Sequence, residues 1–308
     1  MFRGGFLAVS VLAGLMACGP VPPQDPFNLA QAKDNLNKGH HWYLRGCHRE
    51  ASRFFGEGLA YARLADSVPL IVMSHNSMGA AFLAQGRLNE AAVKLSEALE
   101  LSLSVPEHPE LDSIYGNLGS LAFEAGRPKD AEEFWQEALN SAPPHRQTVY
   151  LANLARLYKS QSREAEYLVR ADQCLTASQT KGTAAAARAD ALALGAQVAL
   201  DRGDSQLAET YLNEALNLDR ETENPVGLAQ DLELQAELQL AHGQIREGAQ
   251  SLDRAFYLWA AVGHREAVTR VFALLEKTSR QGFPKELAHY LEVIKNPEAF
   301  DPLGQACP

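Results

Sequence analysis

Small and large apolar residues recur along the chain in an order that repeats about every 40 residues. A small residue precedes a glycine by seven positions, and two more small residues follow that glycine after five and twelve positions. A large apolar residue lies between the later two. The glycines are at 46, 86, 126, 203 and 243, and the large residues are Phe55, Leu95, Trp135, Leu212 and Leu252. Because small residues let antiparallel helices approach and a large one fills the space beside them, this pattern predicts helix pairs joined by glycine turns.

One further unit, between the third and the fifth, fits the pattern less well. Ala155 and Tyr158 suit its first helix, but Ser162 replaces the turn glycine. Tyr167 is bulky where alanine is expected, so we expect this second helix to be shifted or the array to be irregular there. With this unit included, six helix pairs are predicted from about residue 28 to 261.

Two more helices are expected after the last pair. Residues from about His264 to Arg280 form an amphipathic pattern, which would cover the apolar end of the array. Pro284 opens a shorter helix that ends near Lys295, and the tail from Asn296 is expected to be unstructured.

The first residues form a targeting segment rather than part of the fold. Arg3 is the only charge before Asp25, and an apolar stretch of about twelve residues runs from Phe6 to Ala17. A membrane-spanning helix needs roughly twenty residues, so we interpret this stretch as the core of a signal peptide.

The sequence Leu15-Met16-Ala17-Cys18 resembles the lipobox of bacterial lipoprotein signal peptides. The resemblance implies cleavage before Cys18, acylation of its thiol, and anchoring by two or three acyl chains. Gly19, where an aspartate would retain the protein at the inner membrane, favours the outer membrane facing the periplasm. The alternative is an ordinary cleaved signal peptide with a coincidental cysteine.

The helix pairs resemble tetratricopeptide repeats, on the evidence of Gly39-x-x-Trp42 and Leu118-Gly119. The family's common period is about 34 residues, whereas the units here start 40, 40, 36, 41 and 40 residues apart. Tyr115-Gly116-Asn117-Leu118-Gly119 resembles the longer repeats of the kinesin light chain type. The resemblance implies an all-α, right-handed α-solenoid of about six helix pairs with a C-terminal capping helix.

These expectations divide the chain into four segments. They are a lipoprotein signal peptide (1–17), a proline-rich tether (18–27), a repeat array (28–281), and a short helix with a flexible tail (282–308).

Charge and motifs exclude several function classes. The net charge of −10 and pI near 5.4 argue against a nucleic-acid partner. No phosphate-binding loop, nucleophile elbow or metalloprotease motif is present, so we expect no enzymatic activity and no cofactor. His40, His41, Cys47 and His48 lie close in sequence, but they do not have the spacing of converging metal ligands. We therefore expect no metal site.

Four cysteines occur in the chain, and Cys18 is the one assigned to the lipid. The pairing of Cys47, Cys174 and Cys307 is left open by the sequence. Cys47 and Cys174 lie three repeats apart, too far for a direct bond, so Cys174 is expected to be a free, buried thiol.

Arrays of this family bind partners along the concave surface formed by their first helices, so the resemblance also implies groove positions. The candidate partner-binding residues are Tyr43, Asn76, Asn117, Phe123, Asn153, Arg156 and Lys159. In the last two units the groove positions include Gln197, Glu233 and Glu237. By the same resemblance, Asn117 and Asn153 would hold the main chain of a bound segment. The alternative for each asparagine is a hydrogen bond to a neighbouring repeat that fixes the curvature of the array.

The resulting hypothesis is a non-enzymatic, membrane-anchored scaffold or assembly factor of the bacterial cell envelope, either pilotin-like or an adaptor for a cell-wall complex. It would bind a protein or peptide in the groove and the membrane through Cys18. The alternative is a secreted peptide-sensing or enzyme-regulatory binding domain. The fold does not choose between them.

Overall fold

The computed structural model of this protein describes residues 25–280 and 288–295. Regular structure in these two ranges consists of α-helices and one short 3-10 turn, η1 (Pro144–Arg146). The helices are α1 (Phe27–Leu44), α2 (His48–Leu64), α3 (Val68–Ala84), α4 (Leu88–Leu103), α5 (Leu111–Glu124), α6 (Pro128–Ser141), α7 (Gln147–Ser160), α8 (Glu164–Ser178), α9 (Ala185–Asp201), α10 (Ser205–Glu221), α11 (Pro225–Ala241), α12 (Ile245–Ala261), α13 (Arg265–Ser279) and α14 (Ala288–Lys295).

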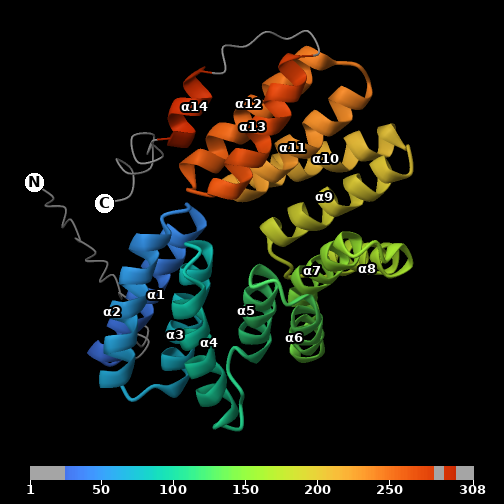
Figure 1. Cartoon of the computed structure of the whole chain (residues 1–308). Helices are drawn as coiled ribbons and strands as arrows, with labels where there is room; N and C mark the ends of the chain where they lie inside the picture. The colour runs from blue at the N-terminus through green and yellow to red at the C-terminus, as the bar shows by residue number, and fades with distance from the viewer. Residues whose placement is uncertain (1–24, 281–287, 296–308) are drawn as a thin grey trace, which may run out of the picture.

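Consecutive helices pack as antiparallel pairs, and each pair packs on the next (Figure 1). Six pairs, from α1–α2 to α11–α12, are followed by α13 and α14. The predicted all-helical solenoid of six pairs is therefore confirmed. None of the described helices meets the length and apolarity required to cross a bilayer.

The contact between the helices of a pair follows from the small and large residues of the sequence pattern. A Cβ atom built on Gly39 would lie 2.4 Å from the ring of Phe55, and one on Gly79 would lie 2.6 Å from Leu95. Any side chain at these glycines would therefore displace the large residue of the second helix. This close approach fixes how each pair packs.

The unit formed by α7 and α8 keeps the shape of its neighbours by different means. Ser162 adopts φ 59° at the turn, which is the left-handed conformation that glycine adopts elsewhere. Tyr167 is fully buried, and Ala171 occupies the position where the other units have a large residue. The large and small residues have thus exchanged places, which conserves the volume between the helices.

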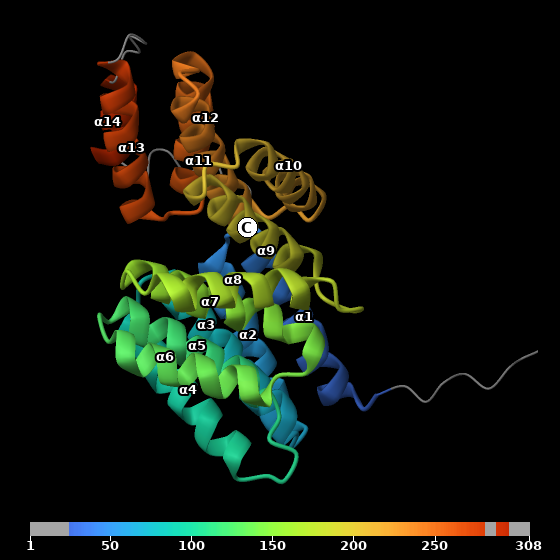
Figure 2. The ribbon, with the colours of Figure 1, turned by 90° about the vertical axis from the view of Figure 1, so that its right-hand side faces the viewer.

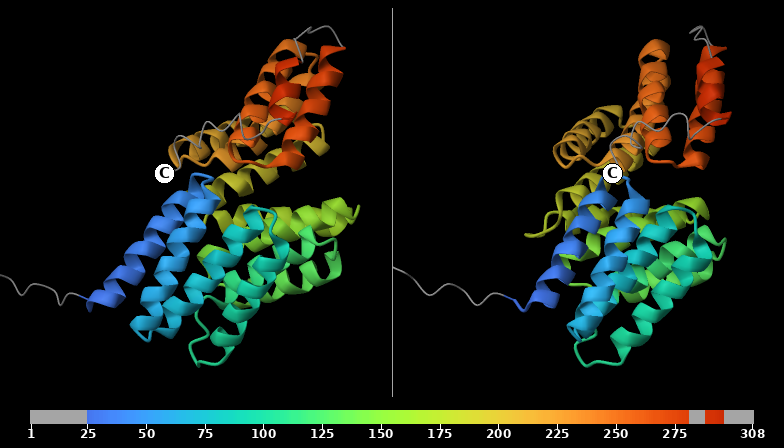
Figure 3. Two further views of the ribbon diagram at one scale, coloured as in Figure 1. Left: turned by 60° about the vertical axis from the view of Figure 1, so that its left-hand side comes forward. Right: turned by 90° about the vertical axis from the view of Figure 1, so that its left-hand side faces the viewer.

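The two ends of the array meet, which a simple solenoid does not require. The Arg45 guanidinium, after α1, lies 3.1 Å from the Glu223 carboxylate, between α10 and α11. Beside it, a Cβ atom on Gly46 would lie 3.0 Å from Val262, after α12. Figure 3 shows the α1–α2 turn next to the C-terminal helices, and Figure 2 shows the molecule from the opposite side, with α8 and α9 in front of this turn. We call these two interactions the closure contact.

The helix expected to cover the last pair is present as α13. It buries Val268, Val271 and Leu275, which belong to the same apolar core as α12. Tyr290 of α14 is also fully buried, with its ring centre 4.9 Å from that of Phe256.

The described residues include two of the four cysteines. Cys174 is a free, buried thiol, as predicted, and its Sγ lies 3.4 Å from the carbonyl oxygen of Thr148. Burial raises its pKa to about 12, so the thiolate that would react is scarce at neutral pH. Cys47 is disulfide-bonded, which removes it as a metal ligand. Cys18, the candidate lipidation site, lies outside the described residues, as do 282–287 and the tail from Asn296.

Candidate partner-binding groove

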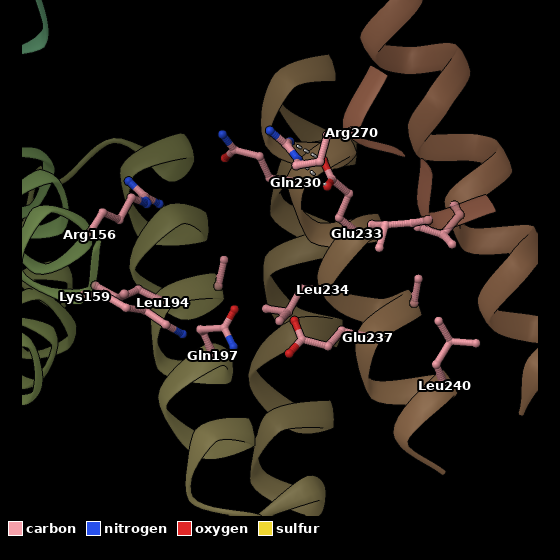
Figure 4. Close-up of a pocket in the computed structure, with 14 residues that line it drawn as sticks. Arg156, Lys159, Leu194, Gln197, Gln230, Glu233, Leu234, Glu237, Leu240 and Arg270 are labelled. Carbon is pink, nitrogen blue, oxygen red and sulfur yellow. Dashed lines mark hydrogen bonds and ion pairs between the residues drawn. The ribbon is translucent and has the colours of Figure 1, made fainter. Parts of the chain in front are cut away.

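A pocket of about 560 Å³ lies on the inner side of the array, between the first helices of its C-terminal half (Figure 4). Its size is within the range of ligand-binding sites in proteins. It is lined by Arg156 and Lys159 of α7, by Ala193, Leu194 and Gln197 of α9, by Gln230, Glu233, Leu234, Ala236, Glu237 and Leu240 of α11, by Leu252 of α12, and by Arg270 and Leu274 of α13.

The apolar part of this pocket comes from leucines on successive helices. Leu194 and Leu234 are nearly buried, whereas Leu274 exposes 38% of its surface. An exposed leucine beside buried ones offers apolar area that a bound side chain could cover.

Arg156, one of the predicted groove residues, is held by the next repeat. Its guanidinium donates two hydrogen bonds to the carboxylate of Asp190 on α9, one of them from Nη1 to Oδ2 at 3.1 Å. A bidentate pair of this kind fixes the orientation of the guanidinium plane. The side chain therefore lies along the pocket with its charge already matched.

Lys159 is held in the same way, one turn further along α7. Its ammonium lies 2.7 Å from Oδ2 of Asp201, at the end of α9. That carboxylate also accepts hydrogen bonds from the Gln197 amide, at 3.1 Å, and from the Tyr167 hydroxyl, at 3.2 Å. Asp201 thus ties α7, α8 and its own helix together.

The opposite side of the pocket contains a third ion pair. Arg270 of α13 donates to both carboxylate oxygens of Glu233 on α11, at 2.9 and 3.1 Å. Trp259 Nε1 donates to the same carboxylate at 2.6 Å. Arg270 and Leu274 were not among the predicted groove residues, because the pattern of α13 indicates only a capping helix.

A polar cluster joins α3 to α5, further toward the N-terminus. Asn117 Nδ2 donates to Oδ1 of Asn76 at 2.8 Å, and Asn76 Nδ2 donates to the Ser113 hydroxyl at 2.9 Å. In the structure these asparagines therefore make the inter-repeat contact that was the alternative to holding a partner's main chain. Asn76 is also 95% buried, which leaves little of it for a ligand.

Asn153 differs from Asn117, although both precede a leucine and a small residue. It is half-buried on α7, one turn before Arg156, and its amide has no hydrogen-bond partner among the described residues. Its donors and acceptors are free for a bound segment.

Tyr43 and Phe123 do not line the pocket. Tyr43, near the end of α1, packs its ring 5.1 Å from that of His48, and burial raises its pKa. Phe123 is 39% exposed on α5 and packs against Trp135 at 5.8 Å between ring centres. Of these seven candidate residues, only Arg156 and Lys159 line the pocket, together with the predicted groove positions Gln197, Glu233 and Glu237.

A buried carboxylate lies behind the pocket. Asp231 of α11 exposes 1% of its surface, and its Oδ2 has no hydrogen-bond partner among the described residues. Burial, with the nearby carboxylates of Asp219 and Asp190, raises its pKa to about 8, against the opposing charges of Arg220 and Arg156. Burial also raises the pKa of Asp219 to about 6. Sequence gave no signal for this group, since an aspartate on a helix is usually solvated.

Within the described ranges, no group of three or more His, Cys, Asp or Glu side chains is arranged to hold a metal ion. The ring of His40 lies 5.2 Å from that of Phe55, and burial lowers the pKa of His48 to about 4. These histidines serve local packing.

Comparisons with known proteins support the repeat assignment. Residues 70–143, which span the second and third helix pairs, match the tetratricopeptide repeat family. A comparison with curated proteins found no match.

Solved structures with the same architecture include three of limited identity. A Rap protein complexed with Competence and Sporulation Factor is 15% identical, with a TM-score of 0.61 over 88% of this chain and 77% of its own. BtubC from P. vanneervenii is 18% identical, with a TM-score of 0.50 over 77% and 91%. The apo form of RapI is 11% identical, with a TM-score of 0.50 over 88% and 77%. At these identities the similarity shows the fold alone.

Proposed function

We propose that this chain is a non-enzymatic scaffold that holds a segment of a partner protein in the pocket between α7, α9, α11 and α13. The observation that carries the proposal is the pocket itself, in which apolar leucines lie between polar side chains that are already held in place by ion pairs. Fixed side chains lose little conformational entropy when a ligand binds, which favours affinity.

The proposal agrees with the kind of surface that this fold presents. A concave face built from first helices offers an extended or helical segment both apolar area and side chains that can hydrogen-bond its main chain. Asn153, with its free amide one turn from Arg156, would hydrogen-bond the main chain of the bound segment.

A second candidate is a domain that binds a short peptide signal rather than a large partner. It is favoured by the similarity to the Rap protein, whose structure contains Competence and Sporulation Factor. The two candidates differ in the ligand that would co-purify with the chain. The scaffold would carry a partner protein, and the peptide-binding domain would carry a short free peptide.

The finer proposal is that the scaffold is lipid-anchored at Cys18 and faces the periplasm from the outer membrane, where it would serve as a pilotin-like factor or cell-wall complex adaptor. It rests on Leu15-Met16-Ala17-Cys18 and on the prolines that follow. Cys18→Ala should abolish incorporation of labelled palmitate and release the protein from membranes. Continued labelling of this variant would contradict the anchor.

The groove is tested by affinity capture from solubilised membranes followed by mass spectrometry. Leu274→Arg places a charge and a longer side chain in the pocket. Leu207→Arg is a matched control, because Leu207 is 40% exposed on α10, outside the pocket. Proteins captured by the unmodified chain and by Leu207→Arg should be lost with Leu274→Arg. Equal capture by all three would place the partner surface elsewhere.

A further inference from the structure

Most of the charge in the pocket is already balanced within the protein. The three cations that line it, Arg156, Lys159 and Arg270, each form an ion pair. Their partners are Asp190, Asp201 and Glu233. These six groups therefore contribute no net charge to a ligand that enters the pocket.

Glu237 also lines the pocket, and its charge is not balanced by an ion pair among the described residues. It is exposed on α11, one turn after Glu233, and its carboxylate forms no ion pair or hydrogen bond within the described part of the chain. In Figure 4 the side chains of Glu237 and Gln197 point toward the same gap between α9 and α11. The Gln197 amide donates a hydrogen bond to Asp201, and as a neutral group it does not balance the charge of Glu237.

Apolar surface lies next to this carboxylate. Leu234 and Leu240 flank Glu237 on the same helix, and Leu274 of α13 exposes 38% of its surface in the same pocket. A free negative charge beside a leucine-lined surface is complementary to a cationic group beside an apolar one.

We propose that the occupant of this pocket is a peptide segment in which a lysine or arginine is placed opposite Glu237 and a leucine-sized side chain packs on Leu234, Leu240 and Leu274. The proposal rests on the function proposed above and adds the chemistry of the bound segment. An acidic segment is disfavoured, because it would have to displace Asp190 or Asp201 from their cations while facing Glu237.

The proposal is tested with a random peptide library displayed on phage and selected against the whole chain. Four forms are compared: the unmodified chain, Glu237→Gln, Glu237→Lys and the groove-blocking Leu274→Arg. Because Glu237 is exposed, its substitutions should leave the circular dichroism spectrum unchanged. Peptides that bind the unmodified chain but not Leu274→Arg are the pocket-dependent set.

Lysine and arginine should be enriched beside an apolar residue in the pocket-dependent set. The enrichment should vanish with Glu237→Gln and change to aspartate and glutamate with Glu237→Lys. In one synthesised peptide, replacing its cationic residue by alanine should raise Kd roughly fivefold for the unmodified chain, the upper range for a partly exposed ion pair. The same replacement should have no effect with Glu237→Gln.

The outcomes separate this proposal from the proposed function. The assignment of Glu237 would be overturned if the pocket-dependent peptides were not enriched in lysine or arginine. It would also be overturned if replacing the peptide's cationic residue weakened binding equally to the unmodified chain and to Glu237→Gln. Either result would leave the groove itself supported. If Leu274→Arg selects the same peptides as the unmodified chain, the pocket is not the binding site. The proposed function and the proposal of a cationic segment would then both be refuted.

Discussion

Replacing Asp231 by asparagine should stabilise the protein at pH 8 and have a much smaller effect at pH 5. The carboxyl group is almost completely buried, and its pKa is raised from 3.8 to about 8 by burial and by Asp219 and Asp190. The folded chain therefore holds a proton on this side chain over a pH range in which the unfolded chain releases it. Asparagine has nearly the same shape and is neutral at every pH.

The sign and size of the effect follow from proton linkage. Between pH 4 and 8 the folded state binds more protons at Asp231 than the unfolded state, so the free energy of unfolding falls as pH rises. Each pH unit in this window costs roughly 1.4 kcal/mol. From pH 5 to pH 8 the wild-type protein should therefore lose roughly 4 kcal/mol relative to Asp231→Asn.

The measurement is urea unfolding followed by circular dichroism at the two pH values. Asp172→Asn is the control, because Asp172 is exposed on α8 and makes no ion pair within the described residues. This control should change stability equally at both pH values. A constant difference between Asp231→Asn and the wild-type protein, or a loss of stability at pH 8, would refute the assignment of a protonated, buried carboxyl group.

Two other predictions concern the array. Ending the chain before His264 should lower the melting temperature more than ending it before Asn296, since α13 buries three large apolar side chains worth roughly 1.5–3 kcal/mol each. Equal melting temperatures would contradict the capping role. Asn117→Ala should cost about 0.5–1.5 kcal/mol of stability, because it removes the hydrogen bond to Asn76. Asn153→Ala should leave unfolding unchanged and weaken partner capture. If instead Asn153→Ala lowered stability and Asn117→Ala weakened partner capture, Asn117 would be the residue that binds the partner.

The helix pairs could be predicted because their packing is local. A small residue, a turn and a large residue within about 16 positions suffice to bring Gly39 onto Phe55, and the same spacing recurs. Where the sizes are exchanged, as at Tyr167 and Ala171, the spacing alone suggested an irregularity. The exchange in fact preserves the packing, because it conserves volume.

The contents of the pocket could be predicted only in part. The resemblance to the repeat family places Arg156 and Lys159 on the inner face. Their partners Asp190 and Asp201 depend on the rotation from one repeat to the next, which a sequence period does not report. For the same reason the sequence does not predict the hydrogen bond from Asn117 to Asn76, 41 residues apart.

The closure contact changes how the array would come apart. Helix pairs at the ends of an open solenoid have a single neighbour, and fraying begins there. Through Arg45 and Gly46 the first pair gains a second neighbour near Glu223 and Val262, so that opening at one end removes support from the other. The ion pair is exposed and contributes about 1 kcal/mol or less, and salt weakens it. Rising ionic strength would therefore weaken the link between the α1–α2 turn and the turns that follow α10 and α12.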